Sequence, residues 1–319
     1  MLANIDELSL KIIRIKSKFK EVARTSRNQK YYSGRVYLPK EYVGKKIHYL
    51  TEEEAKDLVD TLMRLKAILE FSNFILNTKN GSRMFNVVSK TWNPITGCTH
   101  LCRYCWALRL VQTKLKNSPK YRHGFRPTFH ERELKVKFNG GFIFVADMGD
   151  MFCNGVPDEW ITKVLEHISK FPNTYFLLLT KNPERYKDFI KIMPTNVILG
   201  ATIETNRDDL YMENQISNAP LPSLRYKAMR DIKWDKKFIA IEPILDFDLE
   251  VFTKWIRDIN PFLVYIGYDN YNNKLPEPPL TKTLKLKERL SAFTLVVEKT
   301  MRPAWYEKTS LLKHKSNSS

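Results

Sequence analysis

The chain has 319 residues, a length that allows one large domain or two and leaves ample chain to bury a hydrophobic core. Its content of 43% hydrophobic and 12% aromatic residues is typical of a folded protein and excludes a disordered one. No apolar run approaches the roughly 18 residues that a membrane span needs, and the N-terminus lacks the apolar stretch of a signal peptide. Three of the four cysteines crowd into one short stretch, which is not the pattern of a secreted disulfide framework. We therefore expect a protein of the reducing cytoplasm with no membrane partner.

The formal net charge of +18 is unevenly distributed along the chain. Residues 1–50 hold 12 Lys/Arg against 4 Asp/Glu, residues 109–137 hold 9 against 2, and residues 299–319 hold 5 against 1. The remaining chain is close to neutral. Positive charge gathered in this way favours a polyanionic partner, most simply DNA or RNA. A basic surface that is merely solvated is the alternative.

Residues 1–50 predict a basic, β-rich appendage, because short strand-like runs alternate with turns from residue 10 onward. The stretch from Gly34 to Ile47 resembles small archaeal transposon-encoded proteins related to the AbrB-like DNA-binding fold, a swapped hairpin that works as a dimer. A β-appendage that packs on the main domain is the alternative. Tyrosines interleave with the basic residues and suit phosphate contact together with stacking, at Tyr31, Tyr32, Tyr37 and Tyr42.

Residues 51–80 predict an amphipathic linking helix, which starts at a capping box formed by Thr51 and Glu54. Apolar residues then recur at three- and four-residue steps, at Ala55, Leu58, Leu62, Leu65 and Leu69. These leucines could form a dimer seam, so a homodimer through residues 1–76 is one interpretation. Because the repeat covers fewer than three heptads, packing on the neighbouring domain is favoured. The turn-forming residues 78–82 set the domain boundary.

From residue 81 to 305 apolar runs alternate with helical patterns, and residues 306–319 predict a basic, flexible tail. Continuous apolar strands separated by helices predict an α/β fold with a parallel sheet buried on both faces, arranged as a barrel or partial barrel. Helices are expected over residues 158–171, 183–192 and 248–259. Strands are expected over residues 85–88, 142–146, 175–179, 197–201, 238–241, 262–266 and 295–297.

Three cysteines follow the first predicted strand with the spacing C-x3-C-x2-C, at Cys98, Cys102 and Cys105. Thiolates are soft ligands that suit iron–sulfur clusters, zinc or copper(I). Three of them on one short loop can hold three corners of a [4Fe-4S] cluster and leave the fourth iron open. The alternative is a zinc site completed by His100 or Cys153, although zinc sites usually add a second ligand pair that this sequence lacks. A disulfide is less favoured than either.

The motif Cys98-x3-Cys102-x-Tyr104-Cys105 resembles the signature of the radical S-adenosylmethionine (SAM) superfamily, including the aromatic residue before the third cysteine. The lead-in from Thr91 is similar to a phage- and prokaryote-associated branch of that superfamily, distantly like spore photoproduct lyase. The resemblance implies a partial (β/α)6 barrel in which the cysteines bind a [4Fe-4S] cluster. It further implies that SAM chelates the open iron and is cleaved to a 5′-deoxyadenosyl radical, with an electron donor such as a ferredoxin or flavodoxin.

Polar residues follow the predicted strands at once, at the carboxyl ends where barrel enzymes carry their chemistry. Four residues after the second strand occupy the place of the Gly-Gly-Glu element that the resemblance assigns to the SAM amino group, with one glycine retained: Asp147, Met148, Gly149 and Asp150. A turn before the helix at residue 158 is the alternative. Further cofactor contacts are expected from Tyr104, Thr180, Lys181, Thr202, Glu204, Glu242 and Gly267. Plain salt bridges are the alternative for the charged residues among them.

Cys153 lies just past the second predicted strand, and the resemblance to spore photoproduct lyase implies for it a role as hydrogen donor to a product radical. A lone cysteine is otherwise an inert small hydrophobe. The basic segment 109–137, with its aromatic residues, could hold a nucleic-acid backbone while a base is extruded. The sequence therefore favours a radical SAM enzyme that repairs or modifies nucleic acid. The alternatives are radical modification of a protein or small metabolite, and a non-catalytic iron–sulfur regulator that binds DNA.

Overall fold

The computed structural model describes residues 88–307 of the chain. The predicted appendage over residues 1–50, the linking helix over 51–80 and the tail from residue 308 lie outside the described residues, and remain predictions. No helix within 88–307 is long and apolar enough to cross a membrane.

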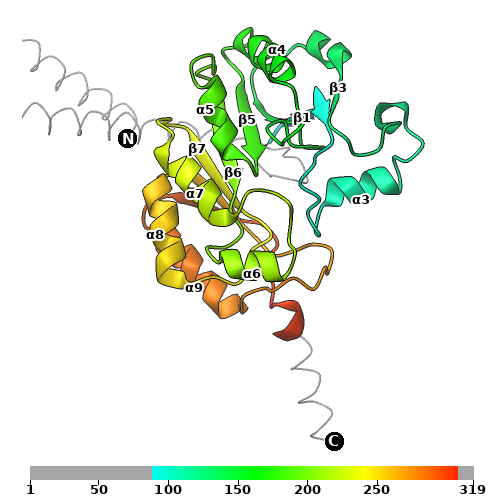
Figure 1. Ribbon diagram of the computed structural model, residues 1–319. Helices are drawn as coiled ribbons and strands as arrows, with labels where there is room; N and C mark the ends of the chain where they lie inside the picture. The colour runs from blue at the N-terminus through cyan, green and yellow to red at the C-terminus, as the bar shows by residue number, and fades with distance from the viewer. Residues whose placement is uncertain (1–87, 308–319) are drawn as a thin grey trace, which may run out of the picture. The chain divides into compact units, whose positions relative to one another are not determined.

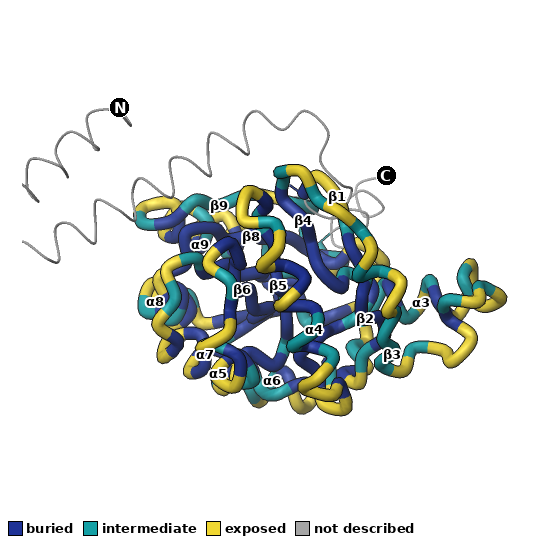
Figure 2. The backbone as a smooth tube through the Cα atoms, turned by 90° about the horizontal axis from the view of Figure 1, so that it is seen from above, coloured by how far each residue is buried: buried dark blue, intermediate teal, exposed yellow. Residues whose placement is uncertain are grey.

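Within the described residues, seven strands form one sheet in which every neighbouring pair is parallel. Along the sheet the strands follow their order in the chain, and the sheet curls into a half-barrel (Figures 1 and 2). The predicted parallel α/β partial barrel is thereby confirmed. The strands are β1 Lys90–Trp92, β4 Phe142–Val145, β5 Tyr175–Thr180, β6 Val197–Thr202, β7 Lys237–Ile241, β8 Leu263–Ile266 and β9 Leu295–Glu298.

The first described strand is β1, which begins at Lys90. The predicted strand at residues 85–88 lies, except for Val88, outside the described residues and remains a prediction. β1 is an edge strand of the described sheet, and only its last residue, Trp92, is buried. An edge strand has no need of the continuous apolar run that marks a strand buried on both faces, so its position does not follow from hydrophobicity.

The helices that connect the strands lie outside the sheet (Figure 1). The predicted helices over 158–171 and 248–259 are confirmed as α4 Asp158–Ser169 and α8 Leu249–Ile259, and that over 183–192 as a 3₁₀ turn, Pro183–Arg185, followed by α5 Tyr186–Phe189. Acidic residues in the first turn of α4 stabilise its amino end, and the left-handed Asn260 ends α8. The other helices are α3 Trp106–Gln112, α6 Asp208–Glu213, α7 Pro222–Asp231 and α9 Leu280–Ser291.

The central strands place alternate side chains on the two faces of the sheet. One row packs against α4, α7, α8 and α9 in the main hydrophobic core. The other row faces the inside of the half-barrel, where Phe144, Leu179 and Ala240 line a cavity. A Cβ on Gly200 would lie 2.9 Å from the ring of Phe238 and 3.1 Å from Leu179, so a residue without a side chain leaves room for these larger neighbours.

Candidate functional site

The cysteine loop enters the site through a close contact between two glycines. Gly97 N donates to Met148 O at 3.0 Å and Gly97 O accepts from Asp150 N at 3.2 Å, which extends the pairing of β1 with β4. A Cβ on Gly149 would lie 2.5 Å from Gly97 O, and one on Gly97 would collide with the backbone of Arg126. Glycine at both positions is therefore required for the path of the loop.

The other side of the loop is held by residues 214–218, which follow α6. His100 O accepts hydrogen bonds from Asn218 N at 2.7 Å and from Ser217 Oγ at 2.9 Å. Ser217 Oγ also lies 3.2 Å from Cys102 Sγ. Because Ser217 is 115 positions away from Cys102 in the chain, tertiary packing rather than local sequence fixes this side of the loop.

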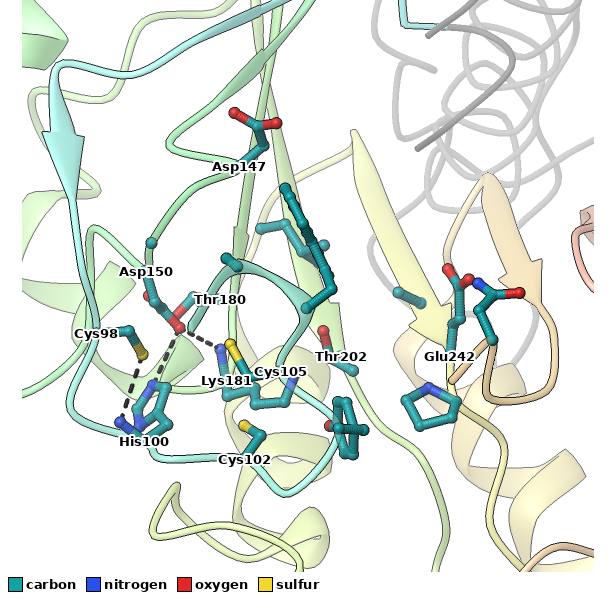
Figure 3. Close-up of a pocket in the computed structure, with 18 of the residues that line it drawn as sticks. Cys98, His100, Cys102, Cys105, Asp147, Asp150, Thr180, Lys181, Thr202 and Glu242 are labelled. Carbon is teal, nitrogen blue, oxygen red and sulfur yellow. Dashed lines mark hydrogen bonds and ion pairs between the residues drawn. The ribbon is translucent and has the colours of Figure 1, made fainter. Parts of the chain in front are cut away.

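All three cysteines of the motif are free and half-buried, and all three line one cavity of about 460 Å³ at the carboxyl ends of the strands (Figure 3). Cys98 Sγ accepts from His100 N at 3.4 Å. Cys105 Sγ accepts from Leu108 N at 3.3 Å and thereby caps the amino end of α3. Together with Cys102, the motif therefore presents three sulfur atoms to a single space.

Asp150 is buried beneath the loop, and donors surround its carboxylate. Burial alone would raise the pKa of Asp150, but the interaction with His100 and the other hydrogen bonds hold it below its ordinary value. Asp150 thus joins the ends of β4 and β5 to the cysteine loop, with both oxygens engaged inside the protein. Its donors are His100 Nε2 at 3.0 Å, Thr180 Oγ1 at 2.7 Å, and the backbone N–H groups of Phe152 and Lys181, each at 2.9 Å.

Glu204, just after β6, forms a fully buried ion pair with Arg225 of α7. Arg225 Nη1 donates to Glu204 Oε2 at 2.7 Å, and both side chains are 0% exposed. Arg225 donates further to Thr202 O at 3.0 Å and Tyr211 OH at 2.6 Å. Burial opposes ionisation of Glu204, yet the charge of Arg225 holds its pKa below the ordinary value. Since Tyr104 OH also donates to this carboxylate, the pair positions the aromatic residue of the cysteine motif.

Two other carboxylates, Asp147 and Glu242, line the cavity itself (Figure 3). Asp147 accepts from Asn93 Nδ2 at 2.5 Å. Glu242 pairs with Lys299 at 2.8 Å. Lys181 Nζ lies 3.8 Å from Glu204 Oε1. The ion pairs considered for the strand ends therefore do form. Burial raises the pKa of both Asp147 and Glu242, because desolvation disfavours the charged form.

Most of the predicted site residues come together around this cavity, and four do not line it: Met148, Glu204, Gly267 and Cys153. Cys153 is 0% exposed and belongs to the main core, and Met148 packs against α3. A Cβ on Gly267 would lie 3.0 Å from the Cβ of Lys299, so this glycine accommodates the segment that follows β9. The predicted residues in the lining are Cys98, Cys102, Tyr104, Cys105, Asp147, Gly149, Asp150, Thr180, Lys181, Thr202 and Glu242.

Aromatic residues form much of the remaining lining and are not among the predicted cofactor contacts. Tyr271 is 49% exposed, and the Arg109 guanidinium lies 5.0 Å from the centre of its ring. Arg109 also donates to Asn273 Oδ1 at 2.8 Å, so it connects α3 with the loop after β8. The sequence features that could indicate these aromatic residues as part of the lining are their closeness in the chain to the cysteine motif or to the end of a strand. The aromatic residues of the lining, besides Tyr104, are Trp106, Phe125, Phe144, Tyr268 and Tyr271.

The donor set suits a bound metal. Three thiols on one loop that share a cavity fit an iron–sulfur cluster, since soft sulfur donors are its usual ligands. A second grouping fits zinc, because ligand atoms of Cys98, His100 and Asp150 lie within 4.8 Å of one another. His100 and Asp150 are bonded to each other, whereas the three thiols share the cavity.

Fold and site together define a parallel α/β half-barrel protein with a three-cysteine loop at the carboxyl ends of its strands. The family model described as "Protein of unknown function (DUF5131)" matches residues 83–257, and the chain belongs to this family. The comparison with curated proteins found no match.

Among solved structures, the chain is similar to a spore photoproduct lyase mutant with bound AdoMet and dinucleoside spore photoproduct. The identity is 13%, the TM-score is 0.44, and the match covers 64% of this chain and 62% of the lyase chain. It is also similar to Streptococcus suis SuiB bound to its precursor peptide SuiA, with 10% identity, a TM-score of 0.42, and coverage of 81% and 58%. The match thus covers less than two thirds of either protein.

Proposed function

We propose that this chain is a radical SAM enzyme in which Cys98, Cys102 and Cys105 hold a [4Fe-4S] cluster beside a cavity that binds SAM. The observation that carries the proposal is that all three thiols line one cavity at the carboxyl ends of parallel strands. When bound, such a cluster supplies the electron that cleaves SAM to methionine and a 5′-deoxyadenosyl radical. The electron would come from a small donor such as a ferredoxin or flavodoxin, in the reducing cytoplasm.

The chain's own residues offer the groups that a bound SAM requires. The carboxylates of Asp147 and Glu242 are acceptors for ammonium and hydroxyl groups, and Thr202 adds a hydroxyl. Lys181 offers a cation to a carboxylate. The aromatic lining provides flat apolar faces for an adenine ring and excludes water from the reacting centre.

We further propose that the substrate is a nucleic acid, because of the charge beside the cavity. The segment from Cys98 to His130 contains no Asp or Glu. β2 (Ile95–Thr96) pairs with β3 (Thr128–Phe129), which returns this segment to the start of the cysteine loop. Residues of the same segment, among them Trp106 and Phe125, line the cavity, and exposed cations on such a segment suit contact with successive phosphates. The exposed cations of the segment are Arg103, Arg109, Lys114, Lys116, Arg122 and Arg126.

Metal analysis after anaerobic reconstitution with iron and sulfide tests the cluster. We expect about four iron and four sulfide per chain, and 5′-deoxyadenosine after reduction in the presence of SAM. Changing Cys98, Cys102 or Cys105 to alanine should abolish both. Cys153→Ala is the matched control and should retain the cluster. Stoichiometric zinc in anaerobically purified protein, or loss of metal from the Cys153 variant, would contradict the three-cysteine site.

Binding measured over a range of salt concentrations tests the nucleic-acid substrate. For each phosphate that the protein no longer neutralises, the log–log salt dependence should flatten by about 0.9 for duplex DNA or about 0.7 for a single strand. Charge reversal of Lys114, Lys116 and Arg122 to glutamate should therefore weaken binding and reduce its slope. The same reversal of exposed lysines elsewhere, Lys191, Lys227 and Lys233, is the control. A full-length chain without salt-sensitive affinity for DNA or RNA would exclude this substrate and favour a protein or metabolite.

A further inference from the structure

The contact between Ser217 and Cys102 carries an inference about this site that rests on the proposed function. Ser217 Oγ lies 3.2 Å from Cys102 Sγ, and the hydroxyl is half-buried where residues 214–218 hold the loop. Ala219 N donates to Ser217 Oγ at 3.1 Å, which fixes the oxygen in place. The sulfur of Cys105, in contrast, accepts a backbone N–H group, which no side-chain substitution removes. Cys98 Sγ accepts the backbone N–H of His100 and also contacts the side chain of Cys153.

The hydroxyl has one proton and three possible acceptors within reach, namely His100 O, Cys102 Sγ and the hydroxyl of Tyr211. With Cys102 as a thiol, the S–H group can donate to Ser217 Oγ, while the hydroxyl donates to His100 O at 2.9 Å. A thiolate ligand has no proton, so the contact then persists as a hydrogen bond only if Ser217 is the donor. His100 O does not become unpaired by this rotation, because Asn218 N still donates to it at 2.7 Å.

We propose that Ser217 is a positioning residue whose hydroxyl donates a hydrogen bond to the Cys102 sulfur in the cluster-bound protein and thereby raises the reduction potential of the cluster. Hydrogen bonds to ligand sulfurs are among the factors that set such potentials. The bond is stronger when the sulfur carries more negative charge, so it stabilises the reduced state more than the oxidised state. The reduction adds one electron, from an external reductant such as dithionite, and moves no proton.

Redox titration of the reconstituted full-length protein with dithionite, followed by absorbance and electron paramagnetic resonance, tests the proposal. Ser217→Ala should shift the midpoint potential downward, by up to about a tenfold change in the reduction equilibrium, which corresponds to about 59 mV for one electron. Ser217→Thr should stay near the wild type, and Ser217→Val, which matches threonine in size but lacks the hydroxyl, should shift as alanine does. Ser169→Ala on α4, which removes a hydroxyl that donates to Glu166 O within the same helix, should cause no shift.

Iron content and melting temperature of each variant separate this inference from the proposed function. A wild-type chain that binds no cluster would defeat the proposed function itself. A wild-type cluster whose potential is unchanged in Ser217→Ala, or equal in the threonine and valine variants, would overturn the role of Ser217 alone. If the alanine variant fails to hold iron, the difference in midpoint potential between Ser217→Thr and Ser217→Val tests the role of the hydroxyl instead.

Discussion

Loss of Arg225 should be among the most damaging single substitutions in the described part of the chain. Replacement by methionine leaves the Glu204 carboxylate, which is 0% exposed, with the more distant Lys181 Nζ at 3.8 Å as its remaining ion-pair partner among the described residues. Breaking one partner of a buried pair costs about 3–5 kcal/mol. For a domain of this size each kcal/mol lowers the melting temperature by about 2–4 °C, so we expect a decrease of roughly 6–20 °C. Glu204→Gln combined with Arg225→Met removes both charges and should recover part of the loss.

Thermal unfolding followed by circular dichroism, on the metal-free chain, measures this effect without any dependence on the cluster. Arg230→Met is a matched control on the same helix, because Arg230 pairs with Asp231 where both side chains are more than 40% exposed. An exposed pair is screened by solvent, so its loss should leave the melting temperature nearly unchanged. Equal effects of the two substitutions, or a double variant as unstable as the two single changes summed, would refute the reasoning.

Three further predictions concern pH, the loop backbone and the cofactor. Burial lowers the pKa of His167, so the unfolded chain binds a proton at this residue before the folded chain does as pH falls. The free energy of unfolding should therefore decline below about pH 6.5. Urea unfolding at pH 5 and pH 8 measures this decline, which His167→Gln should reduce. Gly149→Ala should lower stability by about 1–3 kcal/mol and reduce the iron bound per chain, because its Cβ would lie 2.5 Å from Gly97 O. SAM affinity measured by calorimetry should fall as pH decreases through the raised pKa of Asp147, because the protonated carboxyl loses its charge. Asp147→Asn should remove that part of the pH dependence. A wild-type affinity that does not change between pH 5 and pH 8 would contradict the prediction.

The central strands could be predicted from the sequence because each is buried on both faces and reads as a continuous apolar run. β1 could not, since an edge strand with Lys90 exposed gives no such signal. The cysteine motif is equally local, because its chemistry depends on residue type and spacing within eight positions. That the three thiols would share one cavity also follows from a general rule, that the carboxyl ends of parallel strands meet at one edge.

The partners of individual side chains could not be predicted, because they come from distant parts of the chain. Arg225 belongs to α7, a short helix in which nothing marks this arginine, rather than Arg230, as the buried one. Ser217 stands in a short connection between two helices and carries no motif of its own. The Ser217 contact depends on how the segment after α6 folds back onto the cysteine loop, and the Arg225 contact depends on how α7 packs against the end of β6.

The four carboxylates of the strand ends illustrate the difference between scaffold and ligand-facing groups. Asp150 and Glu204 have their pKa held low because donors from the protein satisfy them, so a ligand gains little by approaching them. Asp147 and Glu242 have their pKa raised by burial, because water has been removed without full compensation. Perturbation of this second kind gathers at functional sites. A cationic group placed in the cavity would stabilise the ionised form of Asp147 and Glu242, and we therefore expect these two carboxylates to contribute binding energy in the proposed SAM site.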